Sequence, residues 1–141
     1  MKVAFDVHGV LDSLPEYRQL LRTMLRDGHT IYIISGQPLD EEMEAFLDKY
    51  DLYDKYHEYR SVETYLLEKG VHDYQETEKG KFWIDEIWDP VKAQICAEEG
   101  IDMIFDNSPS YAETFKNTDT VFSLVIDKTK SLKPPYPHSI R

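Results

Sequence analysis

The side chains best suited to chemistry in this chain come directly after apolar runs. Asp6 and His8 follow the first run in the stretch FDVHGVLD, Asp106 ends the run IDMIF, and Ser35 and Gly36 end the run TIYIIS. Two carboxylates that lie close together repel each other, so a divalent cation is their natural occupant. Oxygen ligands with room for water suit Mg²⁺. These residues therefore predict a magnesium site, provided that the fold brings them together.

The same part of the chain offers groups that could bind a phosphate. Backbone N–H groups near Gly9 and Gly36, together with the Ser35 hydroxyl, are suited to phosphate oxygens. Lys92 falls in the first turn of an expected helix, where the helix dipole disfavours a cation by roughly several tenths of a kcal/mol. A lysine at that position is expected to face an anion; the alternative is an exposed lysine without a function.

Alternating apolar runs and amphipathic segments must position these residues. Strands are expected at 2–7, 30–35, 101–106 and 120–126, with a weaker candidate at 55–61. Helices are expected at 13–28, 38–50, 62–70, 89–100 and 108–117, with Ser13 and Glu16 as a capping box and Asp89 as an N-cap. This order predicts a doubly wound three-layer α/β/α sandwich around a mostly parallel sheet of about five strands. Ligands of such sheets bind outside the carboxyl ends of the strands.

The ordered set of motifs resembles the haloacid dehalogenase-like (HAD) superfamily. FDVHGVLD resembles its first motif, IYIISG its second, the helix-borne Lys92 its third and IDMIFDN its fourth. The resemblance implies a Rossmann-like fold and a phosphatase of the small, capless type acting on a nucleotide or another phosphorylated metabolite. It implies that Asp6 is the nucleophile and forms an aspartyl-phosphate. Asp6, Asp106 and the main-chain carbonyl of His8 would bind Mg²⁺, and Ser35 and Lys92 would hold the phosphoryl group.

Two residues depart from the superfamily's pattern. Its phosphatases usually carry aspartate at the position of His8, as the acid that protonates the leaving group and the base that activates water. Histidine can perform both steps, and its pKa is expected at or below the reference value of about 6.5, because burial and Mg²⁺ disfavour the charged ring. The alternative is an impaired binding or regulatory protein with the same fold. Asn107 stands where many relatives carry a second carboxylate, so its direct contact with the metal is not implied.

The segment 71–89 shows no clear period, and residues 53–88 as a whole are rich in aromatic side chains, including Trp83 and Trp88. The rings could form a lid or stacking platform for a flat substrate, or they could fasten an irregular loop to the sheet edge. The segment leaves room for a small flap only, so the site is expected to be open unless a second copy of the chain covers it. A receiver domain is disfavoured, because the leading acid is single and Lys92 precedes Asp106.

Composition bounds the class of protein. The net charge of −11, from 27 acidic and 16 basic residues, argues against a duplex nucleic-acid partner. No stretch approaches the ~20 apolar residues of a membrane span. The single cysteine, Cys96, fits a reducing, cytoplasmic compartment and is expected in the core. The length predicts one domain over 1–141, with an extended proline-rich tail at 127–141.

Overall fold

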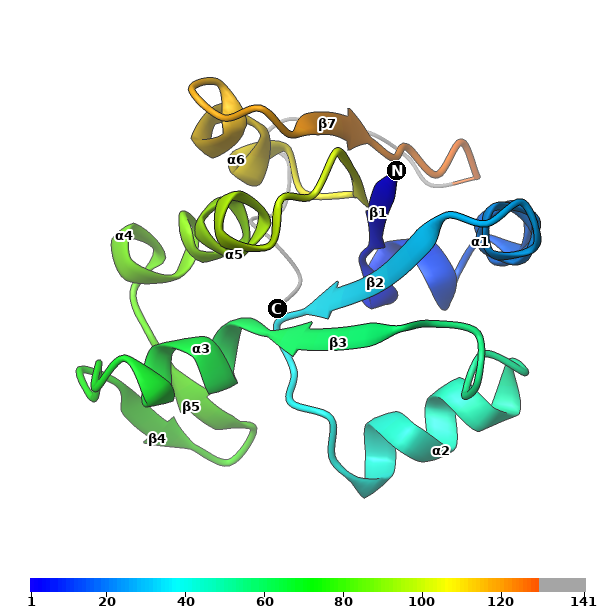
Figure 1. Ribbon diagram of the computed structural model, residues 1–141. Coiled ribbons are helices and arrows are strands. Elements are labelled where there is room, and N and C mark those ends of the chain that lie inside the picture. Colours follow the sequence, from blue (N-terminus) through cyan, green and yellow to red (C-terminus); the bar gives the residue numbers. More distant parts are fainter. Residues whose placement is uncertain (130–141) are drawn as a thin grey trace.

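A five-stranded sheet forms the centre of the protein, whose computed structural model describes residues 1–129 (Figure 1). The expected extended tail therefore lies, from residue 130 onward, outside the described residues. The strand order is β3-β2-β1-β6-β7, and all four pairings are parallel, as predicted. The strands are β1 (Lys2–Phe5), β2 (Thr30–Ser35), β3 (Glu58–Ser61), β6 (Met103–Asp106) and β7 (Val121–Leu124).

Helices cover both faces of this sheet, which makes the predicted three layers. The helical elements are α1 (Pro15–Arg26), α2 (Glu41–Lys49), α3 (Val62–Glu68), α4 (Asp85–Trp88), α5 (Val91–Glu99), α6 (Pro109–Ala112) and η2 (Glu113–Phe115). Successive residues of a strand point to opposite faces. Ile31 and Ile33 accordingly pack in one apolar cluster with residues of α1 and α2, whereas Tyr32 and Ile34 pack in a second cluster with residues of α3 and α5. No helix in the described part of the chain combines the length and apolarity needed to cross a membrane.

Two expected helix caps are wrong. The Ser13 hydroxyl donates to Asp12 Oδ1 (2.7 Å) and caps nothing, because α1 begins with Pro15, whose ring nitrogen needs no acceptor. Asp89 does not cap α5. Its N–H donates to the main-chain oxygen of Asp85, so it closes α4, a short helix that the sequence did not reveal.

The aperiodic segment contains a β-hairpin followed by α4. Its strands, β4 (Gln75–Thr77) and β5 (Gly80–Phe82), are antiparallel and form a sheet of their own. Trp83 and Trp88 are only 0% and 4% exposed, and their ring centroids lie 5.9 Å apart. The two indole rings therefore fasten this segment to the core and are not open to stacking, whereas Phe82 of β5 is 49% exposed.

The sheet order creates a crevice between β1 and β6. The chain first winds from β1 to β2 and β3, and later returns to the other side of β1 through β6 and β7. Connections that leave two neighbouring strands in opposite directions open a crevice at their carboxyl ends. Asp6 directly follows β1 and Asp106 ends β6. The Asp6 N–H donates to the main-chain oxygen of Phe105 (2.9 Å), which extends the pairing of the two strands up to the crevice.

Candidate active site

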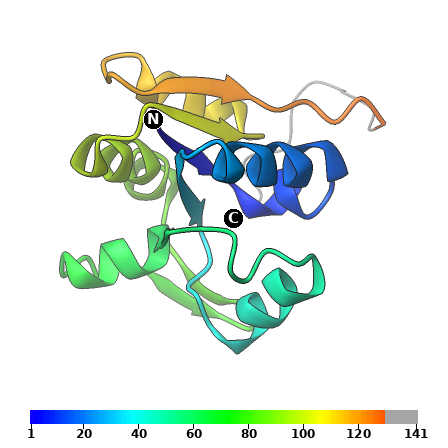
Figure 2. The ribbon, with the colours of Figure 1, turned by 45° about the vertical axis from the view of Figure 1, so that its right-hand side comes forward.

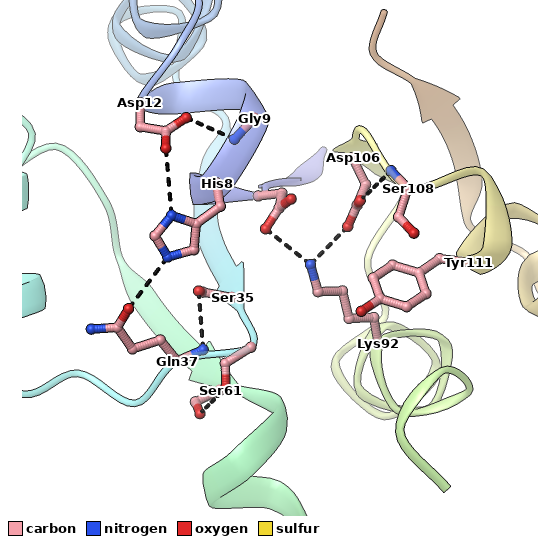
Figure 3. A network of polar contacts seen from close by, with 12 residues as sticks. His8, Gly9, Asp12, Ser35, Gln37, Ser61, Lys92, Asp106, Ser108 and Tyr111 are labelled. Carbon is pink, nitrogen blue, oxygen red and sulfur yellow. Dashed lines mark hydrogen bonds and ion pairs between the residues drawn. The ribbon is translucent and has the colours of Figure 1, made fainter. Parts of the chain in front are cut away.

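A buried lysine joins the two strand-end carboxylates. Lys92 Nζ lies 3.0 Å from Asp6 Oδ1. It also lies 2.7 Å from Asp106 Oδ2 (Figure 3). Lys92, Asp6 and Asp106 are 3%, 4% and 0% exposed. The main-chain N–H of Ser108 donates to Asp106 Oδ1 (2.9 Å) and orients that carboxylate. The lysine thus faces anions, as its place in the first turn of α5 predicted, and the exposed-lysine alternative is wrong.

The charges of this cluster are not balanced. Burial and the neighbouring Asp106 carboxylate raise the pKa of Asp6 above its ordinary value, although Lys92 opposes the shift. Burial alone would lower the pKa of Lys92, but Asp106 and Asp6 outweigh burial and raise it. One ammonium group therefore stays charged beside two acids at a site that water hardly reaches. A further cation would stabilise both acids in their carboxylate form.

The turn Val7–Leu11 (η1) directly follows Asp6 and contains His8. Its conformation depends on Gly9. Gly9 has φ +85°, and a Cβ at this position would lie 1.9 Å from an atom of the Asn107 side-chain amide. Its N–H donates to Asp12 Oδ1 at 2.7 Å. Binding of a phosphate at Gly9 stays a prediction, and the Gly9 N–H would have to exchange the contact with Asp12 for one with the phosphate.

The oxygens near Asn107 fit a hard cation. With its amide nitrogen turned toward them, Asn107 donates to Asp6 Oδ2 (3.1 Å) and to the main-chain oxygen of His8 (3.0 Å). In residues 1–129 no three His, Cys, Asp or Glu side chains converge as a metal site. The donor set that fits is two carboxylates with neutral oxygens.

His8 stands beside this cluster with both ring nitrogens in contact with side chains. Nδ1 lies 3.4 Å from Asp12 Oδ2, and Nε2 lies 3.3 Å from Gln37 Oε1 (Figure 3). The interaction with Asp12 outweighs burial and raises the pKa of His8 above its ordinary value. The lowering expected from Mg²⁺ together with burial concerns the metal-bound site and stays a prediction, whereas the raising effect of Asp12 was not expected from the sequence. A carboxylate that holds one imidazole nitrogen orients the other for proton transfer.

Hydrogen bonds from side chains of β3 hold the loop that follows β2. The Ser61 hydroxyl donates to the main-chain oxygen of Gly36 (3.3 Å), and the Tyr59 hydroxyl donates to that of Gln37 (2.6 Å). In a planar trans peptide the C=O and the next N–H point in opposite directions. Anchoring the Gly36 oxygen on β3 thus turns the Gln37 N–H the other way, where it donates to Ser35 Oγ at 3.2 Å. Ser35 and Gly36 are both buried at this edge of the sheet.

The structure brings Asp6, Asp106 and Lys92 into direct contact and sets His8 and Ser35 beside Gln37. Sequence reasoning missed the supporting side chains. The spacing of four residues between His8 and Asp12 is the one signal that could have revealed such a partner. The other missed side chains come from distant parts of the chain and carry no local signal: Gln37, Tyr59, Ser61 and the hydrogen-bonding role of Asn107.

The comparisons with known proteins bear on the fold. No family model matches the chain. Over 127 residues, 86% of the chain, it is 24% identical to an alpha-amylase of Pyrococcus abyssi (strain GE5 / Orsay), of which it spans only 18%. The crystal structure of an uncharacterized protein from Corynebacterium glutamicum ATCC 13032 Kitasato, at 1.44 Å resolution, is similar with a TM-score of 0.54 and 16% identity, over 89% of this chain and 85% of that one. The likeness to that structure, together with the parallel sheet, shows that the chain has a Rossmann-like α/β fold.

Proposed function

We propose that the protein is a Mg²⁺-dependent phosphatase that hydrolyses a small phosphate monoester through Asp6. The observation that carries this proposal is the buried contact of Lys92 with both Asp6 and Asp106 at the crevice between β1 and β6. A nucleophilic carboxylate, a second carboxylate for a metal and a fixed cation for the phosphoryl oxygens are the parts that this chemistry needs. The four ordered motifs resembling the HAD superfamily support the same reading.

The phosphoryl group would be bound by Lys92 and by donors at the end of β2. Lys92 already contacts Asp6 Oδ1 at 3.0 Å, so a phosphorus atom next to this carboxylate would bring its oxygens within reach of the same ammonium group. The Ser35 hydroxyl ends the neighbouring strand β2, and the Gln37 N–H points toward it. Donors fixed before the substrate arrives stabilise developing charge without reorganisation during the reaction.

The reaction would take place in two displacements. In the first, a carboxylate oxygen of Asp6 attacks phosphorus, the bond from phosphorus to the ester oxygen breaks, and that oxygen takes a proton from His8 and leaves as the alcohol. In the second, His8 takes a proton from water while the water oxygen attacks phosphorus. The bond between phosphorus and Asp6 then breaks, which releases inorganic phosphate and restores the carboxylate. His8 ends each cycle in the protonation state in which it began.

The metal would be held by Asp6, Asp106, the main-chain oxygen of His8 and, with its amide oxygen turned inward, Asn107. When bound, Mg²⁺ would offset the negative charge of the two carboxylates and of the phosphoryl oxygens. The formal charge of the buried cluster, two acids beside one ammonium group, supports this assignment.

A second candidate function is binding of a phosphorylated ligand without turnover. It is favoured by the contacts of His8, because Asp12 and Gln37 engage both ring nitrogens and an acid/base needs one nitrogen free to face the leaving group. The two functions share the fold, the metal ligands and the phosphate-binding groups. They differ in whether the Gln37 contact opens when a substrate arrives.

Phosphate release from a panel of sugar phosphates, nucleotides and phenyl phosphate, with and without Mg²⁺, separates the two functions. A phosphatase should release phosphate only with Mg²⁺, and Asp6→Asn should abolish release because an amide is a poor nucleophile. Lys116→Ala, at an exposed ion pair with Glu113, serves as the control and should retain activity. Release that persists in Asp6→Asn would refute the nucleophile, and ligand binding without any release would support the second function.

A further inference from the structure

A hollow of about 390 Å³ opens beside the candidate active site. It lies where the β4–β5 hairpin approaches the connection from β2 to α2, and Figures 1 and 2 both show these two segments side by side. We call it the hairpin hollow. Its charged and amide-bearing lining residues are Gln37, Asp40, Glu42, Glu63, Lys79 and Lys81. Its volume is within the range of small-molecule sites, about 300–1,000 Å³.

Gln37 connects the hairpin hollow to the reacting groups. Its side chain lies between the two, because Oε1 is 3.3 Å from His8 Nε2 and Nε2 donates to Asp40 Oδ1 at 3.4 Å. His8 Nε2 is the nitrogen that would give its proton to the leaving oxygen. The rest of the leaving group must therefore extend past Gln37, and the hairpin hollow is the space on that side.

The two walls of the hairpin hollow carry opposite charges that do not pair. Asp40 and Glu42 come from the start of α2 and Glu63 from the start of α3, whereas Lys79 and Lys81 come from the hairpin. In the described residues no ion pair joins either lysine to a carboxylate. Asp40 Oδ1 also caps α2 by accepting from the Met43 N–H (2.9 Å), and Lys81 Nζ lies 5.5 Å from the centroid of the Tyr74 ring. A ligand between the two walls would meet acceptors on one side and donors on the other.

We propose that the hairpin hollow binds the leaving group of the substrate, and that this group is polyhydroxylated, as in a sugar or polyol phosphate. The proposal rests on the proposed phosphatase function and adds its substrate class. A hydroxyl group both donates and accepts, so each hydroxyl can donate to a carboxylate of one wall and accept from an ammonium group of the other. Such hydrogen bonds to charged groups are stronger than those between neutral groups.

A flat aromatic leaving group fits this lining poorly. A nucleobase needs an exposed ring face on which to stack. Trp88 is the single aromatic residue that lines the hairpin hollow within residues 1–129, and it is only 4% exposed because it packs in the core. Lys79 and Lys81 are therefore specificity-determining residues for hydroxyl-rich substrates, with Glu63 facing them.

The test measures binding and does not require turnover. Asp6→Asn protein, with Mg²⁺ present, is titrated with inorganic phosphate, glucose 6-phosphate, phenyl phosphate and O-phosphoserine, followed by the amide resonances of Gln37, Lys79 and Lys81. Glucose 6-phosphate should bind about tenfold or more tightly than inorganic phosphate and phenyl phosphate. It should shift the amide resonances of the hairpin, whereas inorganic phosphate should leave them in place.

Replacing the two lysines of the hairpin should abolish only the sugar's advantage, that is, the tighter binding of glucose 6-phosphate than of inorganic phosphate. Adding Lys79→Ala and Lys81→Ala should bring the affinity for glucose 6-phosphate close to that for inorganic phosphate, whose own affinity stays within about twofold. The matched control, Lys116→Ala with Lys128→Ala, removes the same charge from exposed positions outside the hollow and should retain the advantage. Glu63→Gln should lower the affinity for glucose 6-phosphate and leave the affinity for inorganic phosphate unchanged.

The outcomes separate this proposal from the proposed function. The inference is overturned if phenyl phosphate or O-phosphoserine binds more tightly than glucose 6-phosphate, or if the sugar's advantage survives loss of both lysines. Wild-type protein that hydrolyses phenyl phosphate through Asp6 but gives one of those results keeps the phosphatase function and loses the substrate class. Protein that binds glucose 6-phosphate in the hollow but hydrolyses nothing loses the phosphatase function and keeps the sugar-binding site. No binding of any probe overturns the inference as well.

Discussion

Two polar clusters meet at the same edge of the sheet, and they are built differently. In the first, Lys92, Asp6 and Asp106 are almost completely buried, and the two contacts of the lysine measure 3.0 Å and 2.7 Å. In the second, His8 and Asp12 have side chains that are 29% and 25% exposed, and their contact measures 3.4 Å. The first cluster has short contacts and is closed to solvent. The second has a longer contact and is partly open to solvent.

The difference suggests that the two clusters have different roles in the proposed reaction. Charges at a site from which water is excluded interact strongly and stay fixed, which suits the nucleophile and the groups that stabilise the phosphoryl charge. Partly exposed contacts contribute little to stability and can be exchanged for contacts with a ligand. The partly exposed cluster therefore suits a proton donor, because the donor must exchange its contacts for new ones with the leaving group. The buried cluster should therefore matter to folding as well as to activity, and the exposed cluster to activity alone.

The largest effect is expected from removing the buried lysine. Lys92→Met leaves two buried acids facing each other without a counter-charge, so the free energy of unfolding should fall by about 3–5 kcal/mol. Urea unfolding followed by circular dichroism measures the change. Lys116→Met, at the exposed pair with Glu113, is the control and should unfold like the wild type. Equal stability of the two variants would remove the distinction between the buried and the exposed cluster.

Substitution of His8 should affect catalysis without affecting stability. His8→Ala should slow hydrolysis of an alkyl phosphate about 10²-fold, because its leaving oxygen needs a proton, and should slow an activated aryl phosphate much less. Asp12→Asn should give a smaller loss with the same preference, because Asp12 acts by orienting His8. Steady-state kinetics on both substrates, beside urea unfolding of each variant, checks the two parts. If the hydrolysis rates of the two substrates fall equally, neither residue serves proton transfer.

The turn between the clusters gives an intermediate effect. Gly9→Ala must adopt φ +85° and place its Cβ against the Asn107 side chain, whereas Gly28→Ala must adopt φ +91° with nothing within 4 Å. The conformational cost is shared, so the difference between the two variants isolates the clash, and Gly9→Ala should be less stable by roughly 1–3 kcal/mol. Thermal unfolding of both provides the comparison. Adding Asn107→Ala should recover part of the loss, and no recovery would mean that the clash is unimportant.

The smallest effect concerns Cys96, one helical turn after Lys92 on α5. Lys92 keeps its charge because two carboxylates face it, whereas burial raises the pKa of the Cys96 thiol to about 12. The native thiol should stay protonated, so iodoacetamide should label the native protein far more slowly than the unfolded chain between about pH 8 and 9. Above the unfolded pKa the native state holds the extra proton, so this group should lower stability as pH rises. Mass spectrometry of the labelled protein measures the rates, and equal rates in both states would show that the thiol is accessible.

The sequence by itself determined the sheet and the buried cluster. Continuous apolar runs such as TIYIIS indicate strands covered on both faces, and the structure has strands at all five expected positions. Because the carboxyl ends of parallel strands meet at one edge, acids at the ends of two runs were predicted to approach each other. Lys92 was predictable for a related reason: a cation in the first turn of a helix needs an anion nearby.

Only the tertiary structure decided the exposed cluster and the hairpin hollow. The pairing of His8 with Asp12 depends on the left-handed conformation of Gly9, and its pairing with Gln37 depends on hydrogen bonds from β3 to the loop after β2. The hairpin has no apolar period, because Trp83, outside its two strands, fastens it to the core. Apart from the pairing of His8 with Asp12, these contacts join residues far apart in the chain through single side chains. They leave no repeating pattern in the sequence, and they form only when the packed sheet and helices hold the loops in place.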